Sequence, residues 1–201
     1  MKLVPVATNV EAALALEWLA SEPYARFVYE SEEEGRALAR FVLEQSVGEV
    51  AAGSLAQEED GDAVMGLLVM LDGAELRSAR SAAAMAMARA KKIDPRGSVR
   101  DRMFLAGDTL MEVAPTELYL SRIAVDPTFR RRGIAVALMD RFEAEGRARG
   151  STRLVLEVAR ESADAIALYE RCGFGGLGVH ETTDPDTGRV LAYCHMAKPL
   201  S

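Results

Sequence analysis

The chain has 201 residues, of which 49% are hydrophobic and 27% charged, the usual balance of a globular protein with a sizeable core. Its formal net charge of -7 argues against a general nucleic-acid binder, because phosphate binding requires a basic surface. Cys172 and Cys194 lack metal-ligand spacing, and the sequence has no secretory segment and no run of membrane-spanning length. We therefore expect a cytoplasmic protein without a metal site or a membrane partner.

The first elements are predicted to be a strand and two helices. Residues 2–6 alternate weakly and predict a short strand, after which Thr8 or Asn9 provides an N-cap. The apolar side of the helix that follows comprises Ala12, Leu14, Leu16, Trp18 and Leu19. Ser31 and Glu34 have the spacing of a capping box and predict a second helix that ends near Ser46. Its core-facing residues are expected to be Leu38, Phe41, Val42 and Gln45.

The next segment is predicted to be a hairpin followed by a helical insertion. Residues 53–58 and 63–71 form the two strands, with Asp60-Gly61 in the turn between them. Residues 73–107 are expected to pack over one side of the sheet, as a helix over 81–90, a break at Asp94-Pro95 and a short helix after Ser98. Four methionines here and just beyond suit either an adaptable apolar pocket or the surface of a homodimer: Met85, Met87, Met103 and Met111.

The second half is predicted to contain a strand–helix–strand crossover and a final hairpin. Residues 118–125 form a strand, and Gly133 starts a helix that Gly150 closes. The apolar stripe of that helix is expected to be Ile134, Leu138, Phe142 and Glu145. A strand over 153–158, a helix over 163–171, and antiparallel strands over 177–182 and 190–197 complete a mixed α/β (α+β) order.

The run Arg130-Arg131-Arg132-Gly133 lies between a strand and a helix. The first turn of a helix has N–H groups without intrahelical partners and a positive dipole, so a diphosphate can bind there. Gly133 and Ala135 keep bulky side chains away from such a ligand, and the arginines add charge-assisted hydrogen bonds. The alternatives are a solvated turn and, through Glu157 at the end of the next strand, a dinucleotide site. No Walker sequence is present.

Two stretches of this sequence resemble the GNAT N-acetyltransferase superfamily. Ile123-Ala124-Val125 followed by Arg130-x-x-Gly133-x-Ala135 is similar to its motif A. Leu156-Glu157-Val158, then Tyr169 and Gly173-Phe174, is similar to its motif B. The resemblance implies one domain over 1–201 with a mixed, mostly antiparallel central sheet flanked by helices. Its helical insertion, at about 73–107, falls between the third and fourth strands, and the acetyl-CoA motifs span 117–175.

The resemblance also implies a function and a set of site residues. The activity is the transfer of an acetyl group from acetyl-CoA, a co-substrate, to an amine acceptor that attacks directly in a ternary complex. The residues expected to bind acetyl-CoA are Ile123, Ala124, Val125, Arg130, Arg131, Arg132, Gly133, Ile134, Ala135, Val136, Ser162 and Tyr169. Tyr169 is also expected to protonate the departing thiolate. Ser162 stands where family members often have asparagine, and its shorter side chain reaches less far.

The general base has several candidates. Glu117 is the first choice, because it shares one face of its strand with Tyr119 and Ser121. Glu157, His180 and a chain of waters are the alternatives, and Tyr119 occupies the strand position where some members of the family have a glutamate.

The acceptor site is expected near the first helices and the last hairpin, at Tyr24, Phe27, Tyr29, the acidic run 32–34 and His180. Aromatic rings beside carboxylates suit a cationic amine, although helix-start electrostatics also explain the acidic run. The alternative function is a non-catalytic acyl-CoA sensor of the same fold. The presence of Tyr169 favours catalysis over sensing.

Overall fold

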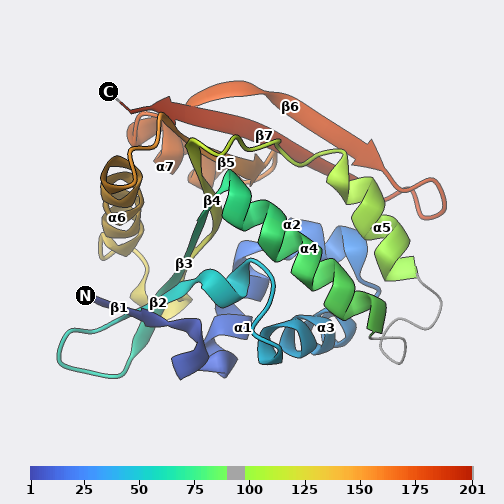
Figure 1. The fold of residues 1–201 in the computed structure, drawn as a ribbon, viewed down its shortest axis with the longest axis horizontal. Coiled ribbons are helices and arrows are strands. Elements are labelled where there is room, and N and C mark those ends of the chain that lie inside the picture. The colour runs from blue at the N-terminus through green and yellow to red at the C-terminus, as the bar shows by residue number, and fades with distance from the viewer. Residues whose placement is uncertain (90–97, 201) are drawn as a thin grey trace.

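Seven strands form one sheet in the order β1-β2-β3-β4-β5-β7-β6 (Figure 1). The structure, a computed structural model, describes residues 1–89 and 98–200. The strands are β1 (Lys2–Pro5), β2 (Ser54–Gln57), β3 (Val64–Asp72), β4 (Glu117–Val125), β5 (Arg153–Ala159), β6 (Gly175–Thr183) and β7 (Val190–Pro199). The α-helices are α1 (Val10–Ala20), α2 (Glu22–Val28), α3 (Glu32–Glu44), α4 (Gly73–Arg89), α5 (Ser98–Gly107), α6 (Ile134–Ala148) and α7 (Ala163–Arg171). Short 3-10 helices are η1 (Val6–Thr8), η2 (Val50–Ala52) and η3 (Pro127–Phe129). The expected mixed α/β fold, with helices inserted between the third and fourth strands, is confirmed.

The sheet opens between β4 and β5. Within the described residues these two strands are the parallel pair, joined by the crossover helix α6, and all other neighbours are antiparallel. Their pairing covers only Glu117 to Leu120 and Arg153 to Leu156. Beyond it β4 continues along β3, while β5 continues along β7. The carboxyl-terminal parts of β4 and β5 therefore separate within the sheet.

A β-bulge in β4 lies at the point of separation. Val69 of β3 pairs with Arg122, and the next residue, Met70, pairs with Leu120. Ser121 is thus an extra residue on β4, and such a bulge bends its strand and increases the local twist. As a result, the adjacent residues Ser121 and Arg122 both line the same cavity.

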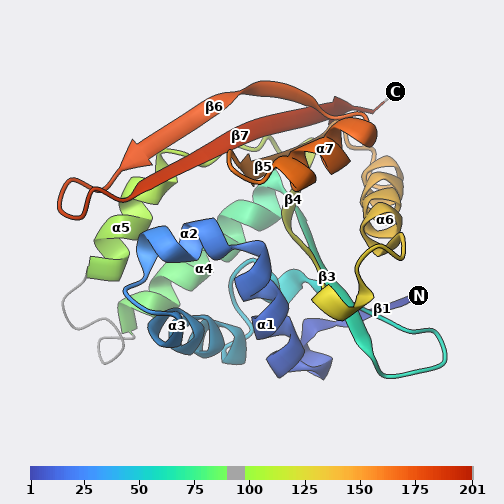
Figure 2. The same ribbon diagram turned by 180° about the vertical axis from the view of Figure 1, so that it is seen from behind.

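Helices cover both faces of the sheet (Figures 1 and 2). On one face α6 packs against β3, β4 and β5, and buries Ile134, Leu138 and Phe142 as expected. Glu145 was also expected on this stripe, but it is only half-buried and pairs with Arg149 at 2.8 Å. On the other face α1 and α4 pack against β3 and β4, and α3 packs against both of these helices. Each face thus buries its own hydrophobic cluster.

The predicted caps of the first helices are present. The Asn9 side chain accepts a hydrogen bond from the Ala12 N–H (3.1 Å) and starts α1. The Ser31 hydroxyl accepts one from the Glu34 N–H (3.1 Å) and starts α3. Gln45, expected on the core face of α3, is exposed, because α3 ends at the preceding residue.

The inserted helix α4 begins at Gly73 and not near Ser81 as expected. One Asp72 side-chain oxygen accepts hydrogen bonds from the N–H groups of Ala74 (2.8 Å) and Glu75 (2.9 Å). These bonds satisfy donors of the first turn and extend the helix back to the end of β3.

The second inserted helix, α5, follows Ser98 as predicted, whereas the break expected at Asp94-Pro95 lies outside the described residues. Helix α2 was not predicted, because it has only seven residues with a proline in its first turn. Phe27 of α2, Ala106 of α5 and Leu191 of β7 belong to one buried cluster. Helix α5 is therefore packed between α2 and the last hairpin.

Candidate functional site

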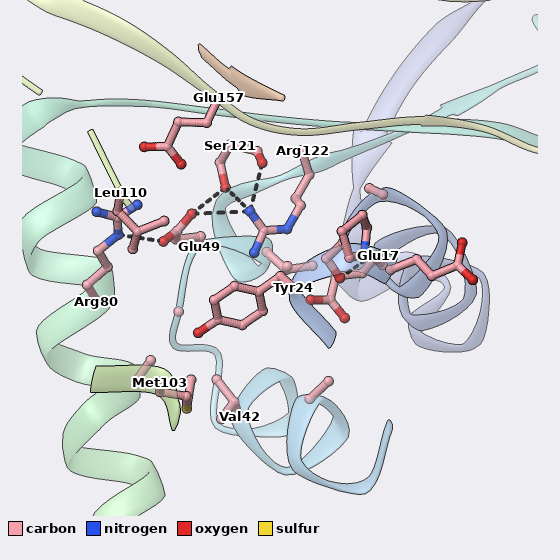
Figure 3. A pocket seen from close by; sticks show the side chains of 18 of the residues that line it. Glu17, Tyr24, Val42, Glu49, Arg80, Met103, Leu110, Ser121, Arg122 and Glu157 are labelled. Atoms are coloured by element: carbon pink, nitrogen blue, oxygen red, sulfur yellow. Dashed lines mark hydrogen bonds and ion pairs between the residues drawn. The ribbon is translucent and has the colours of Figure 1, made fainter. Parts of the chain in front are cut away.

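A cavity of about 1230 Å³ lies on the α1 and α4 side of the sheet, where β4 and β5 separate. Its walls come from α1 to α5, from the separated parts of β4 and β5, and from α7 and β7. Many of its lining residues are apolar, but charged side chains meet at one end (Figure 3). The cavity is large enough for a small molecule together with part of a longer one.

The start of α6 has the backbone geometry of an anion site. Gly133 caps the helix with a φ of +77°, a left-handed conformation that favours glycine, and Arg131 has a φ of +60°. The first N–H groups of the helix have no intrahelical partners. A Cβ on Gly133 would have no protein atom within 4 Å, so the space before these N–H groups is open. Arg130, Arg131 and Arg132 are exposed around it.

The freed edge of β4 leads from this cradle to the cavity. From Ser121 to Val125, β4 has no strand partner on its β5 side among the described residues. Such an edge offers N–H and C=O groups that an extended ligand can pair with. Ile123 lines the cavity, and Ala124 and Val125 pair with β3 on the opposite side.

Helix α7 brings Tyr169 and Ser162 to the cavity. The Tyr169 ring is buried and packs against Phe174, with ring centroids 6.2 Å apart. Burial raises the pKa of its phenol, so Tyr169 keeps its proton at neutral pH. Ser162 caps α7 through its carbonyl, which accepts from the N–H of Ala165 (3.0 Å), while its side chain makes no capping hydrogen bond.

Glu157 belongs to β5 and lines the same cavity, where β5 separates from β4. One of its carboxylate oxygens accepts a hydrogen bond from the backbone N–H of Met111, and the other accepts one from the Tyr119 hydroxyl (3.1 Å). Burial raises the pKa of Glu157 to about 7, although these two bonds and the nearby Arg80 oppose the shift. A carboxylate with this pKa can take up a proton near neutral pH.

Four side chains form a charged group beside Glu157, which we name the Glu49 cluster: Glu49, Arg80, Ser121 and Arg122 (Figure 3). The Arg80 Nε donates to Glu49 at 2.8 Å, and the Ser121 hydroxyl donates to the other Glu49 oxygen. Arg122 Nη1 lies 3.7 Å from Glu49 and donates to the Ser121 carbonyl at 2.7 Å. Burial opposes the ionisation of Glu49, but the attraction of Arg122 and Arg80 outweighs it and lowers the pKa.

The structure does not bring Glu117 to the cavity. Glu117 is the first residue of β4, at the end where β4 and β5 are still paired. Its carboxylate accepts from Arg153 Nε (2.7 Å) and from the Ala114 N–H (3.0 Å). Both oxygens are thus engaged in holding the start of the strand.

His180 also lies apart from the residues that line the cavity. Its ring stacks on that of His195 at 4.0 Å, and the His195 Nε2 contacts the carbonyl of Thr109 at 2.8 Å. Of the acceptor residues expected from the sequence, Tyr24 and Tyr29 line the cavity, whereas Phe27 is in the core.

The methionines of the inserted region take different positions. Met87 and Met103 line the cavity, Met111 is buried, and Met85 is 59% exposed. Only two of the four methionines, Met87 and Met103, therefore line a pocket as expected.

The Glu49 cluster and the Met111 contact were not predicted. Glu49 and Arg80 are far from Ser121 and Arg122 in the sequence, and the one signal is Arg122, a charged residue in the middle of a mostly apolar strand. Within residues 1–89 and 98–200, no helix is long and apolar enough to cross a membrane. The same residues contain no group of three or more histidine, cysteine or acidic side chains arranged to hold a metal.

Comparison with known proteins identifies relatives of this chain. A model of the acetyltransferase (GNAT) family matches residues 13–174. Ribosomal protein bS18-alanine N-acetyltransferase of Escherichia coli (strain K12) is 39% identical over 98 residues, which are 48% of this chain and 66% of that protein. The match thus spans just under two thirds of the relative's length.

Solved structures share the fold. The ribosomal-protein-S18-alanine N-acetyltransferase from Escherichia coli superposes with a TM-score of 0.55 at 22% identity, over 100% of this chain and 94% of its own. A Bacillus subtilis acetyltransferase in complex with CoA gives a TM-score of 0.53 at 12% identity, over 95% of this chain and 93% of its own. At these identities the likeness concerns the arrangement of helices and strands.

Proposed function

The chain belongs to the GNAT acetyltransferase family, and on that premise we propose that it transfers the acetyl group of acetyl-CoA to the amine of an acceptor. The observation that carries the proposal is the position of Glu157 and Tyr169. Both line one cavity at the opening between β4 and β5, next to an anion cradle at the start of α6. A proton acceptor and a proton donor are the two groups that this reaction needs.

The coenzyme is proposed to lie along the freed edge of β4. The first N–H groups of α6 and the side chains of Arg130, Arg131 and Arg132 would bind its diphosphate, since both carry positive charge. The backbone from Ile123 to Val125 would pair with its pantetheine arm, and Ser162 would reach that arm from α7. Bound acetyl-CoA supplies an acetyl thioester, and the β4 backbone would orient it toward the cavity.

Glu157, and not Glu117, is proposed as the base. Glu157 lines the cavity and has a pKa of about 7, whereas Glu117 lies at the far end of β4, outside the cavity, in an ion pair with Arg153. Its carboxylate would accept a proton from the acceptor ammonium, directly or through one water, and release the free amine. The Met111 N–H and the Tyr119 hydroxyl would keep the carboxylate oriented while its charge changes.

Tyr169 is proposed as the acid. When the amine nitrogen forms its bond to the acetyl carbon, the carbon–sulfur bond breaks and leaves a thiolate. The Tyr169 phenol would donate its proton to that thiolate, because burial keeps the phenol protonated at working pH. As the carbon–sulfur bond breaks, the attacking nitrogen loses its second proton to solvent. The products are an acetylated amine and a thiol, with Glu157 protonated and Tyr169 deprotonated until exchange with solvent restores both groups.

The test is a titration followed by an assay. Isothermal titration of the folded protein with acetyl-CoA should show micromolar binding, with NAD as the control ligand that should not bind. Release of free thiol should then be screened with primary amines, including an alanine-terminated peptide, since the Escherichia coli relative is named for an alanine amine. Binding of acetyl-CoA without thiol release from any amine would favour a non-catalytic acyl-CoA sensor. Absence of binding would refute the proposal.

A further inference from the structure

The Glu49 cluster is not needed for the proton transfers proposed above, yet it occupies one end of the same cavity (Figure 3). Its two arginines come from different elements. Arg80 belongs to the inserted helix α4, and Arg122 follows the bulge in β4. The fold therefore brings two guanidinium groups together beside one carboxylate, Glu49, in a largely buried place.

The Glu49 cluster contains two positively charged side chains and one ionised carboxylate. Glu49 is ionised, because Arg122 and Arg80 hold its pKa low despite burial. Burial raises the pKa of the two other carboxyl groups that line this end, Glu17 and Glu157. Within the Glu49 cluster itself, two arginines therefore face a single ionised carboxylate, so the cluster has an excess of positive charge.

The guanidinium of Arg122 has a hydrogen-bond donor that is not used within the described part of the chain. Its Nη1 donates to the carbonyl (2.7 Å) and hydroxyl (3.2 Å) oxygens of Ser121. Its Nε is buried and has no hydrogen-bond partner in the described part of the chain. A buried donor without an acceptor is destabilising, and the planar fork of a guanidinium matches the two oxygens of a carboxylate.

The distance from this cluster to the proposed base suits a small molecule. The guanidinium of Arg80 lies 5.8 Å from the centroid of the Tyr119 ring. The hydroxyl of the same ring donates to Glu157. About one tyrosine side chain thus separates Arg80 from the base, and the ring of Tyr24 lies next to Arg122 in the cavity (Figure 3).

We propose that the acceptor carries a carboxylate in addition to the amine that is acetylated, and that Arg122, with Arg80 beside it, binds that carboxylate. This inference rests on the proposed transferase function, with the amine placed at Glu157. The acceptor is then an amino acid or a peptide that carries a carboxylate close to its amine. Arg122 and Arg80 determine specificity, and neither takes part in proton transfer.

The experiment compares pairs of acceptors that are similar in shape and differ in whether they carry a carboxylate. Initial rates of thiol release are measured for free amino acids and for their amides, and for dipeptides of alanine with aspartate or asparagine, each with an amidated C-terminus. In the wild type, kcat/KM for the carboxylate member of at least one pair should exceed that of its neutral partner by about tenfold to a hundredfold, the usual range for a charge-assisted hydrogen bond. The difference should reside mainly in KM. Preference for the amino-acid pairs identifies a free amino acid, and preference for the dipeptide pair identifies an acidic peptide.

Variants test the assigned residues. Arg122→Gln should reduce the preference to about twofold or less, while Arg122→Lys should retain part of it, because charge remains but the fork is lost. Arg141→Gln, which removes the same charge from an exposed position on α6, should leave the preference unchanged. If Arg122→Gln does not fold, Arg80→Gln provides the second test. Equal rates within every pair in the wild type, or an unchanged preference in a folded Arg122→Gln, would overturn the inference.

A binding measurement separates this inference from the proposed function. Calorimetry with CoA present compares an N-acetylated amino acid with its amide, as product ligands that need no turnover. Tighter binding of the acid, lost in Arg122→Gln, supports the carboxylate site even if no amine is acetylated. Equal binding of the two overturns it even if neutral amines are good acceptors.

Discussion

Replacing Glu157 by glutamine removes the proposed base with little change in shape. The amide oxygen can still accept from the Met111 N–H, and the amide nitrogen can donate to the Tyr119 hydroxyl. General-base catalysis contributes about 10²–10⁴-fold to a rate, so kcat/KM should fall by at least about a hundredfold. The dissociation constant for acetyl-CoA should stay within about twofold, because Glu157 faces the acceptor and not the cradle.

The pH dependence provides a second measurement on the same variant. Only ionised Glu157 can accept a proton, and its pKa is about 7. The ratio of wild-type to variant kcat/KM should therefore rise with pH, by about tenfold per unit below pH 7, and level off above it. Taking the ratio removes the titration of the acceptor amine, which is common to both proteins.

The free energy of unfolding should change with pH in the opposite direction to the rate. The folded-state pKa of about 7 is above the ordinary value of 4.5, so the folded protein binds the extra proton more tightly. Wild-type stability relative to Glu157→Gln should therefore be greatest below pH 4.5 and decline as the pH rises to 7, by on the order of 3 kcal/mol at most. Thermal unfolding of both proteins at pH 5 and pH 8 would measure this change.

Glu117→Gln is the matched control. It breaks an ion pair with Arg153 and should lower the melting temperature, but the pH midpoint of kcat/KM should remain near 7. Our reasoning would be refuted if Glu157→Gln kept full activity with the same pH midpoint, or if that midpoint disappeared only in Glu117→Gln.

Three further substitutions test the acid, the cradle and the insertion. Tyr169→Phe keeps the ring packing and should lower kcat by about 10²–10⁴-fold with coenzyme affinity nearly unchanged; equal losses in both would assign Tyr169 to binding or packing. Gly133→Val should abolish acetyl-CoA binding, measured by calorimetry, because the side chain would fill the cradle and disfavour the φ of +77°. The far-ultraviolet circular dichroism should stay native. Unchanged affinity would place the diphosphate elsewhere. Gly73→Ala should lower the free energy of unfolding in urea by about 2 kcal/mol or more, because its Cβ would lie 2.6 Å from the carbonyl oxygen of Ala114. Gly107→Ala, with no neighbour within 4 Å, should cost less than about 0.5 kcal/mol, and equal losses at the two glycines would contradict this account.

Local patterns predicted most of the elements. Hydrogen bonds between near neighbours decide where helices begin, which is why the caps at Asn9 and Ser31 were found correctly. The start of α4 was missed because its capping residue, Asp72, is also the last residue of a strand. Helix α2 was missed because its stability comes from packing against α5 and not from its own seven residues.

The site was only partly predictable, for a different reason. Tyr169 and the cradle at Gly133 lie within continuous stretches whose spacing carries information. The choice between Glu117 and Glu157 depends on where β4 and β5 separate, and that point is set by the pairing of residues more than thirty positions apart. The alternation of side chains along a strand shows which of them share a face of the sheet. It does not show at which end the strand separates from its neighbour. The contacts of Glu49 with Arg80 and Ser121 have the same non-local origin.

The inserted region contributes to the site at two levels. It supplies Arg80 directly, and the chain that leaves α5 contacts the paired strands β5 and β7. There the Met111 N–H binds Glu157, while the Thr109 carbonyl contacts His195 on the adjacent strand β7. These two contacts hold one short segment across both strands, so the position of the proposed base depends on the insertion. Helices α4 and α5 and the segment after α5 thus form part of the wall of the proposed active site, and acceptor specificity should change with them while the coenzyme half remains the same.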